Sequence, residues 1–243
     1  MVNRRQFLTA GVAVASGIAT ADSLFGLSEL GRIEPAAAWP RGCIDHLPKS
    51  ENRRLAWTVD DGASLHALRG YVDMLEKHPE IRMTMFVLAG ASSWKKLARP
   101  LAELAATGQL QLANHTVNHH DMTQLSNRKI KQELVLASRF IEDQFGVDPG
   151  PYWRPPYGYI DSHLIRVARD LGYTKPVLWF GSTASNSGVK PSTVWSNCKK
   201  WMTNGRIVID HANSDSTVVN FGRIRELLAS RELETVTLND VFA

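Results

Sequence analysis

Two adjacent carboxylates, Asp60 and Asp61, directly follow the apolar run 55–59 and precede Gly62. The apolar run predicts a buried strand, and the glycine permits a sharp turn after it. Two anions in one pocket repel each other, so a bound cation or a shifted pKa must relieve them. A solvated turn would have the same local sequence, so the case for a site depends on partners elsewhere in the chain.

His115 and His119 are four residues apart. In a helix or a tight turn both imidazoles would point to one side, where they could share a metal ion. Such a pair is more often found on an ordinary surface, but an aspartate from another strand end would complete a set of two histidines and one carboxylate. That set leaves positions open for water and substrate. Zinc is the expected metal, cobalt or another divalent ion could replace it, and iron(II) is the alternative.

Two further ionisable residues stand where apolar runs end. Arg154 precedes two prolines, and beside a carboxylate pair it would keep one acid ionised and fix its orientation. His211 follows the apolar run 207–209, and opposite a metal and an aspartate it could serve as a general acid. Taken singly, each is equally compatible with a surface arginine or a hydrogen-bonded histidine at a strand end.

The elements that must position these side chains alternate along the chain. We expect strands at 54–59, 82–87, 109–113, 152–154, 176–180, 206–210 and 234–238. Amphipathic runs between them predict helices at 65–75, 94–107, 130–145 (after Ser126 as N-cap), 162–171, 193–203 and 220–230. The alternation predicts an α/β single domain with a parallel sheet, a distorted barrel of seven or eight strand–helix units, or else an open doubly wound sheet. In such barrels the strand ends carry the chemistry.

Length and composition are ordinary for a globular enzyme. The chain has 243 residues, of which 44% are hydrophobic and 21% charged, with a net charge of +4. The charge contains no run of lysine and arginine, so it argues against nucleic acid as a partner and only weakly for an anionic cell envelope. The oligomeric state is not predicted. Cys43 and Cys198 are too few for a thiolate zinc site, and they could pair after export or stay as thiols.

The N-terminal residues predict export. Arg4 and Arg5 precede the weakly apolar stretch 9–21, which resembles a twin-arginine signal. The stretch is too short and too weakly apolar for a stable membrane span. A cytoplasmic protein with an apolar N-terminal helix, or a protein with an uncleaved anchor, would have a similar composition. We therefore expect a signal peptide and leader over 1–38, a linker or lead-in over 39–53, and a catalytic domain over 54–243, located in the periplasm, in the cell wall or outside the cell.

Four motifs, in order, resemble the polysaccharide deacetylases, the NodB-homology domain of carbohydrate esterase family four. Residues 58–62 read Thr-Val-Asp-Asp-Gly, where the family has Thr-Phe-Asp-Asp-Gly. Residues 115–119 read His-Thr-Val-Asn-His, residues 154–157 read Arg-Pro-Pro-Tyr, and residues 209–211 read Ile-Asp-His. Each motif is weak singly, but four in order at expected strand ends are specific. The resemblance covers the chain from residue 54 onward.

The resemblance implies a role for each matching residue. It implies three metal ligands, which are Asp61, His115 and His119. It also implies a general base, a residue that orients the base and a general acid, which are Asp60, Arg154 and His211. The backbone N–H of Tyr157 would stabilise the oxyanion, and Pro156 and Trp179 would border the substrate. Amide hydrolysis needs these functions together, because it requires an activated water, an oxyanion site and an acid for a poor leaving group.

The fourth family motif is missing. Where the family often has Asp-x-x-Asp-Trp, this chain has Ser182, Ser185 and Asn186. The family's aspartate normally tunes the acid histidine, so the acid role of His211 needs another support, for which Asp210 and Asp215 are candidates. The main hypothesis is therefore an exported, metal-dependent hydrolase that removes N-acetyl or O-acetyl groups from a carbohydrate polymer, such as peptidoglycan, chitin oligosaccharide or poly-N-acetylglucosamine. The alternatives are a carbohydrate-binding protein of the cell envelope with little or no catalysis, and an amidohydrolase for a small molecule.

Overall fold

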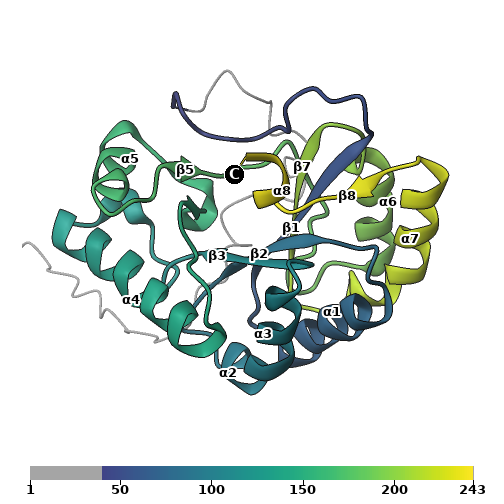
Figure 1. Ribbon diagram of the computed structural model, residues 1–243, viewed down its shortest axis with the longest axis horizontal. Coiled ribbons are helices and arrows are strands. Elements are labelled where there is room, and N and C mark those ends of the chain that lie inside the picture. The colour runs from purple at the N-terminus through teal and green to yellow at the C-terminus, as the bar shows by residue number, and fades with distance from the viewer. Residues whose placement is uncertain (1–39, 243) are drawn as a thin grey trace, which may run out of the picture.

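A computed structural model describes residues 40–242, and the expected export segment lies outside this part of the chain. A parallel eight-stranded sheet forms the centre, with strand order β5-β4-β3-β2-β1-β7-β6 and β8 paired to the start of β1. The strands are β1 (Arg54–Asp61), β2 (Met83–Val87), β3 (Leu110–Asn114), β4 (Tyr152–Trp153), β5 (Lys175–Pro176), β6 (Gly181–Ser182), β7 (Arg206–His211) and β8 (Glu234–Thr235). Helices surround these strands (Figure 1).

The sheet must curl because its two edge strands are joined by a very short link. Residues 177–180 connect β5 to β6, which are opposite ends of the strand order. In a flat sheet six strand spacings would separate the edges by about 29 Å, whereas the connection can span at most about 18 Å. The sheet therefore forms a half-barrel, which confirms the expected distorted α/β barrel and excludes the open doubly wound sheet.

The link 177–180 also explains why the strand expected at 176–180 is wrong. The N–H of Val177 donates to Trp153 O in β4, whereas that of Phe180 donates to Ile207 O in β7. The backbone thus changes partners from one edge to the other within four residues, so it cannot continue as one strand. Ile44 in the N-terminal lead-in bridges Val177 and lies against this link.

The helices lie close to the expected ranges, with one break. They are α1 (Leu65–Lys77), α2 (Ser93–Lys96), α3 (Ala98–Ala106), α4 (Asn127–Phe145), α5 (Ser162–Arg169), α6 (Pro191–Trp201), α7 (Phe221–Ser230) and α8 (Asn239–Phe242). The helix expected at 94–107 is divided at Leu97. Pro100 accounts for the break, because its ring would clash with the carbonyl of Lys96 in a continuous helix, whereas it is tolerated in the first turn of α3.

Side chains of the central strands alternate between two faces. In β1, Trp57 and Val59 belong to the core between sheet and helices, whereas Ala56 belongs to the core inside the barrel. In β7, Val208 packs on the helix side and Ile209 on the inner side. This two-residue period places successive side chains at a strand end on opposite faces of the sheet.

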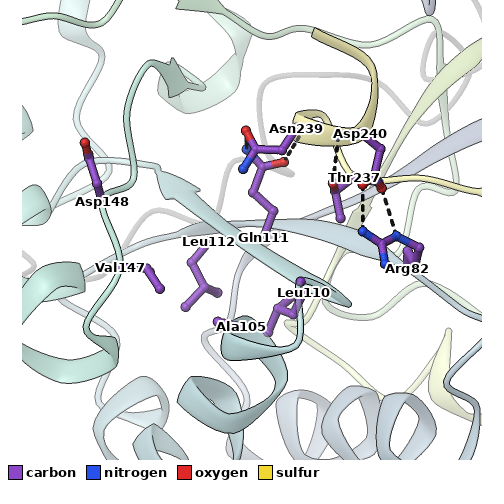
Figure 2. Close-up of a pocket in the computed structure, with 11 residues that line it drawn as sticks. Arg82, Ala105, Leu110, Gln111, Leu112, Val147, Asp148, Thr237, Asn239 and Asp240 are labelled. Atoms are coloured by element: carbon purple, nitrogen blue, oxygen red, sulfur yellow. Dashed lines mark hydrogen bonds and ion pairs between the residues drawn. The ribbon is translucent and has the colours of Figure 1, made fainter. Parts of the chain in front are cut away.

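The C-terminal segment closes the end of the barrel where the strands begin. Its backbone N–H groups bond in turn to β1, β2 and β3, namely Val236 N to Leu55 O at 2.9 Å, Leu238 N to Thr84 Oγ1 at 3.1 Å and Asn239 N to Gln111 Oε1 at 3.0 Å. Figure 2 shows Asn239 beside Gln111 and Asp240 facing Arg82 in a pocket at this end. The closed end leaves the opposite end, where the strands finish, for chemistry.

Two further features concern cysteines and membrane spans. Cys43 and Cys198 are both unbonded thiols, and burial, followed by the charge of Asp45, raises the pKa of Cys43 to about 11. Among residues 40–242, no helix has the length and apolar character needed to cross a membrane.

The Arg82–Asp240 ion pair gives a test of how the C-terminal segment is held. Arg82 donates to both carboxylate oxygens of Asp240, at 2.8 and 2.6 Å. Burial alone would raise the pKa of Asp240, but hydrogen bonds from Arg82 and Thr237 lower it below its ordinary value of 3.8. We expect Asp240→Asn to lower the free energy of unfolding at neutral pH by about 1 kcal/mol, since the pair is partly exposed.

The stabilisation from Asp240 should be present above pH 3.8 and should disappear as the pH falls through the lowered folded-state pKa. Denaturant unfolding of wild type and variant from neutral to strongly acidic pH measures this difference. Asp148→Asn is the matched control, because Asp148 lines the same pocket and has no ion pair with an arginine within residues 40–242. A difference between wild type and Asp240→Asn that stayed constant down to the lowest pH would contradict the prediction.

Candidate active site

Asp61, His115 and His119 converge at the carboxyl ends of β1 and β3. The Nε2 atoms of His115 and His119 lie 3.3 and 3.4 Å from Asp61 Oδ1. The three potential ligand atoms all lie within 4.8 Å of one another. The sequence placed these residues at separate strand ends, and the curled sheet brings them together as predicted.

The donor atoms of this cluster are prepared for a cation. His115 Nδ1 donates to Arg154 O at 2.7 Å, which leaves Nε2 as the unprotonated nitrogen of the neutral ring. Burial lowers the pKa of His119 to about 4, so that ring is neutral at neutral pH. Burial would raise the pKa of Asp61, but the adjacent imidazoles of His115 and His119 lower it below its ordinary value of 3.8.

Asp61 Oδ1 is the observation that tests the fit of a metal. This oxygen is buried and has no hydrogen-bond partner among residues 40–242, although two imidazole nitrogens face it. An unpaired buried carboxylate oxygen is costly unless a cation binds it. One carboxylate and two imidazoles match the ligand preference of zinc and similar divalent ions. The cluster therefore fits a divalent metal.

Asp60 is held by a buried arginine. Arg154 Nη1 lies 2.6 Å from Asp60 Oδ1, and both side chains are inaccessible or nearly so. Arg154 also donates to the carbonyls of Val177 and Leu178 at 3.1 Å, and its guanidinium stacks 4.1 Å from the ring centre of Phe86. Desolvation lowers the pKa of Arg154, although Asp60 opposes that shift. The other oxygen, Asp60 Oδ2, lies 3.7 Å from His115 Nε2 and faces the metal cluster.

His211 lies beside Asp60 on the neighbouring strand. It ends β7 and is the register partner of Asp60 on β1. The two-residue period that puts Ile209 on the inner side also places the side chain of His211 on the inward face of β7. Its Nδ1 is buried without a hydrogen-bond partner among residues 40–242. No carboxylate of that part of the chain thus orients the imidazole directly.

The remaining predicted residues lie in and under the turn that follows β4. Tyr157 sits in the turn after β4 with a φ of 61°, and its ring packs edge-on against His119 with 4.5 Å between centroids. Pro156 is buried in that turn. Trp179 lies under the turn, where a Cβ at Gly158 would come within 2.8 Å of the indole. Gly158, at a φ of 70°, has no side chain and lets the turn approach Trp179 closely.

Three supporting residues were missed by the sequence reasoning. Asn213 Nδ2 donates to Asp61 Oδ2 at 2.6 Å, and its Oδ1 accepts from Ala63 N. Glu133, buried in α4, accepts from the N–H groups of residues 117 and 118 at 2.9 Å, and so holds the turn between the two histidines. Asn114 Oδ1 accepts from Thr116 N in the same turn. An acidic residue on the apolar face of α4 was the one available sequence indication, whereas Asn213 had none.

The segment that replaces the fourth family motif contains no acid. Ser182 Oγ accepts from Ala184 N, and Ser185 Oγ accepts from His211 N at 2.8 Å. Neither serine bonds to the ring of His211. The absence of the family's aspartates at 182 and 185 therefore has a consequence in the structure, because Nδ1 of His211 has no hydrogen-bond partner among residues 40–242.

Comparison with known proteins identifies the relatives of this chain. The profile of the polysaccharide deacetylase family matches residues 48–176. Peptidoglycan-N-acetylglucosamine deacetylase PgdA of Listeria monocytogenes is 27% identical over 205 residues, which cover 82% of this chain and 41% of PgdA. Chitin deacetylase 1 of Cryptococcus neoformans is 34% identical over 125 residues, which cover 50% of this chain and 25% of that protein.

Among solved structures, the T48 deacetylase with substrate superposes with a TM-score of 0.69 at 26% identity, covering 79% of this chain and 91% of that one. The chain thus spans less than half the length of the curated relatives named above, but most of a solved deacetylase structure.

Asn213 provides a test of how the metal site is oriented. Asn213→Ala removes the hydrogen bond to Asp61 Oδ2, so we expect the affinity for zinc to fall about 10- to 100-fold. Competition with a chromophoric chelator measures this affinity, with His115→Ala marking the loss expected when a ligand itself is removed. Asn127→Ala, at the exposed start of α4, is the control. Wild-type affinity in Asn213→Ala would show that Asp61 needs no such support.

Proposed function

Because this chain belongs to the polysaccharide deacetylase family, we propose that it hydrolyses acetyl groups from a carbohydrate polymer of the cell envelope. The observation that carries the proposal is the buried Asp60–Arg154 pair beside the Asp61, His115 and His119 cluster. A protein that only binds sugars needs no carboxylate held at this cost next to a metal site. The pair therefore favours catalysis over the alternative of an inactive binding protein.

Each residue has a task that follows from its geometry. A divalent ion held by Asp61, His115 and His119 would acidify a water and polarise the acetyl carbonyl. Asp60 Oδ1 is engaged by Arg154, so Oδ2, which faces the cluster, takes the proton of the attacking water.

The tetrahedral oxyanion and the leaving amine need two more groups. The backbone N–H of Tyr157, presented by the left-handed turn at that residue, donates to the oxyanion. His211, on the strand next to Asp60, delivers a proton to the departing nitrogen. The base and the acid thus approach the substrate from neighbouring strands. Trp179 and Pro156 form part of the wall of the substrate-binding site.

The substrate we propose is an N-acetylated amino-sugar polymer. The relatives named above act, by their names, on peptidoglycan N-acetylglucosamine and on chitin. The same residues would hydrolyse an O-acetyl ester. The alcohol that leaves from an ester depends less on a general acid than the amine that leaves from an amide. Zinc is the metal we propose, and export by a twin-arginine signal would bring the protein to such a polymer.

Asp60→Asn tests the assignment of the base. The variant keeps the size of the side chain and an acceptor for Arg154 but cannot take a proton, so we expect acetate release to fall at least about 100-fold. Zinc affinity should stay close to that of wild type, because Asp60 is not a ligand. The assay follows acetate released from chitooligosaccharides, peptidoglycan and acetylxylan by the mature chain with added zinc or cobalt.

The outcomes separate the hypotheses. Acetate release by wild type that is lost in Asp60→Asn would establish the hydrolase and identify its substrate class. A wild-type protein that binds zinc but releases no acetate from any of the three polymers would overturn the proposal in favour of a binding protein. Equal activity of wild type and Asp60→Asn would refute the role of Asp60.

A further inference from the structure

Asp210 is a buried carboxylate that the proposed reaction does not use. It directly precedes His211 in β7, it is fully inaccessible, and its side chain lies on the helix side of the sheet, opposite the active site. No lysine, arginine or histidine forms an ion pair with it among residues 40–242. A buried carboxylate without a cation must be stabilised by hydrogen-bond donors.

Six donors converge on the two oxygens of Asp210. Oδ2 accepts from Trp57 Nε1 at 2.9 Å and from Tyr71 OH at 2.6 Å. Oδ1 is approached by Thr183 Oγ1 at 2.7 Å, Thr217 Oγ1 at 2.8 Å, His211 N at 3.0 Å and the hydroxyl of Ser185. These donors come from β1, α1, the segment after β6, the end of β7 and the segment before α7. One carboxylate therefore ties five parts of the chain together beside His211.

The two oxygens serve different parts of the molecule. Oδ2 bonds to side chains of the helix-side core, whereas the groups around Oδ1 belong to His211 and to the segments that follow β6 and precede α7. Ser185 links Asp210 to His211, because its hydroxyl donates to Asp210 Oδ1 and accepts from the backbone N–H of His211 at 2.8 Å. Ala184, next to it, has a φ of 57°, an unfavourable conformation that persists only where surrounding contacts fix it.

The imidazole of His211 depends on this backbone support. Its Nδ1 has no hydrogen-bond partner among residues 40–242, so no side chain there holds the ring through that nitrogen. The position of the ring is then determined by the backbone of His211 and by the groups that pack around it. We propose that Asp210, acting through Ser185, is a positioning residue that fixes the backbone of His211 and so places the acid over the leaving group. This inference rests on the proposed function, in which His211 is that acid.

The chemistry of the leaving group allows a direct test. An acetamide releases an amine that needs a proton, whereas para-nitrophenyl acetate releases a stable phenolate that needs none. Loss of acid positioning should therefore lower amide hydrolysis and spare the aryl ester. A general loss of structure or of metal would lower both activities together.

We would compare Asp210→Asn and Ser185→Ala with the control Tyr71→Phe, which removes a donor from Oδ2 but leaves the Oδ1 side intact. For Ser185→Ala we expect kcat on a chitooligosaccharide to fall about 10- to 100-fold, since small misplacements of catalytic groups have effects of this size. KM should change less than about twofold, and aryl ester hydrolysis and zinc affinity should remain near wild type. Asp210→Asn should behave in the same direction, and Tyr71→Phe should lower the Tm without this selective loss.

A second comparison uses the His211→Ala background. There, Ser185→Ala should cause no further loss of amide hydrolysis, because the group that it positions is absent. Equal losses on amide and aryl ester, the same loss in Tyr71→Phe, or a full additional loss in His211→Ala would each overturn the inference and assign a structural role to Asp210. Wild type that hydrolyses neither substrate class would instead refute the proposed function itself, so the two failures are distinguishable.

Discussion

The buried ion pair between Asp60 and Arg154 is the constraint on which the rest of the site depends. Removing both charges from water is expensive, and the attraction between them compensates only when the geometry is close and every other polar atom is satisfied. Arg154 meets these conditions through two backbone carbonyls and the face of Phe86. The carbonyls belong to Val177 and Leu178, in the link that makes the sheet curl. The curvature of the barrel and the place of the proposed base are therefore one structural feature.

The carboxylates at the strand ends outnumber the permanent positive charge beside them. Asp60 and Asp61 bring two buried carboxylates, and Arg154 provides one positive charge. His119 is neutral at neutral pH because burial lowers its pKa. The remaining negative charge lies at Asp61 Oδ1, the unpaired oxygen between two imidazoles. A divalent ion bound to this oxygen would neutralise that charge.

Backbone strain is concentrated around this site. Of the six non-glycine residues with positive φ between residues 40 and 242, four are Asp61, Thr116, His119 and Tyr157. Such conformations cost about 1–3 kcal/mol each and persist where neighbours impose them. Here the neighbours are Asn213 for Asp61 and Glu133 and Asn114 for the histidine turn. A fifth, Ala184, lies in the segment fastened to Asp210. The rigid core thus supports side chains in orientations that a relaxed backbone would not give them.

The sequence by itself determined the alternation of strands and helices, the parallel sheet that follows from it, and the residues at the strand ends, because these depend on local patterns and on the rule that parallel strands end at one edge. It left a barrel and an open sheet as alternatives, and the link at 177–180 decided between them. It also determined the absence of acids at 182 and 185. Only the tertiary structure decided that Asn213 holds Asp61, that Asp210 meets Trp57, and that residues 177–180 are a link between edges. Those contacts join groups separated by 152 and 153 positions. They arise from the pairing of β1 with β7, which are far apart in the chain, and they leave no periodic trace in the sequence.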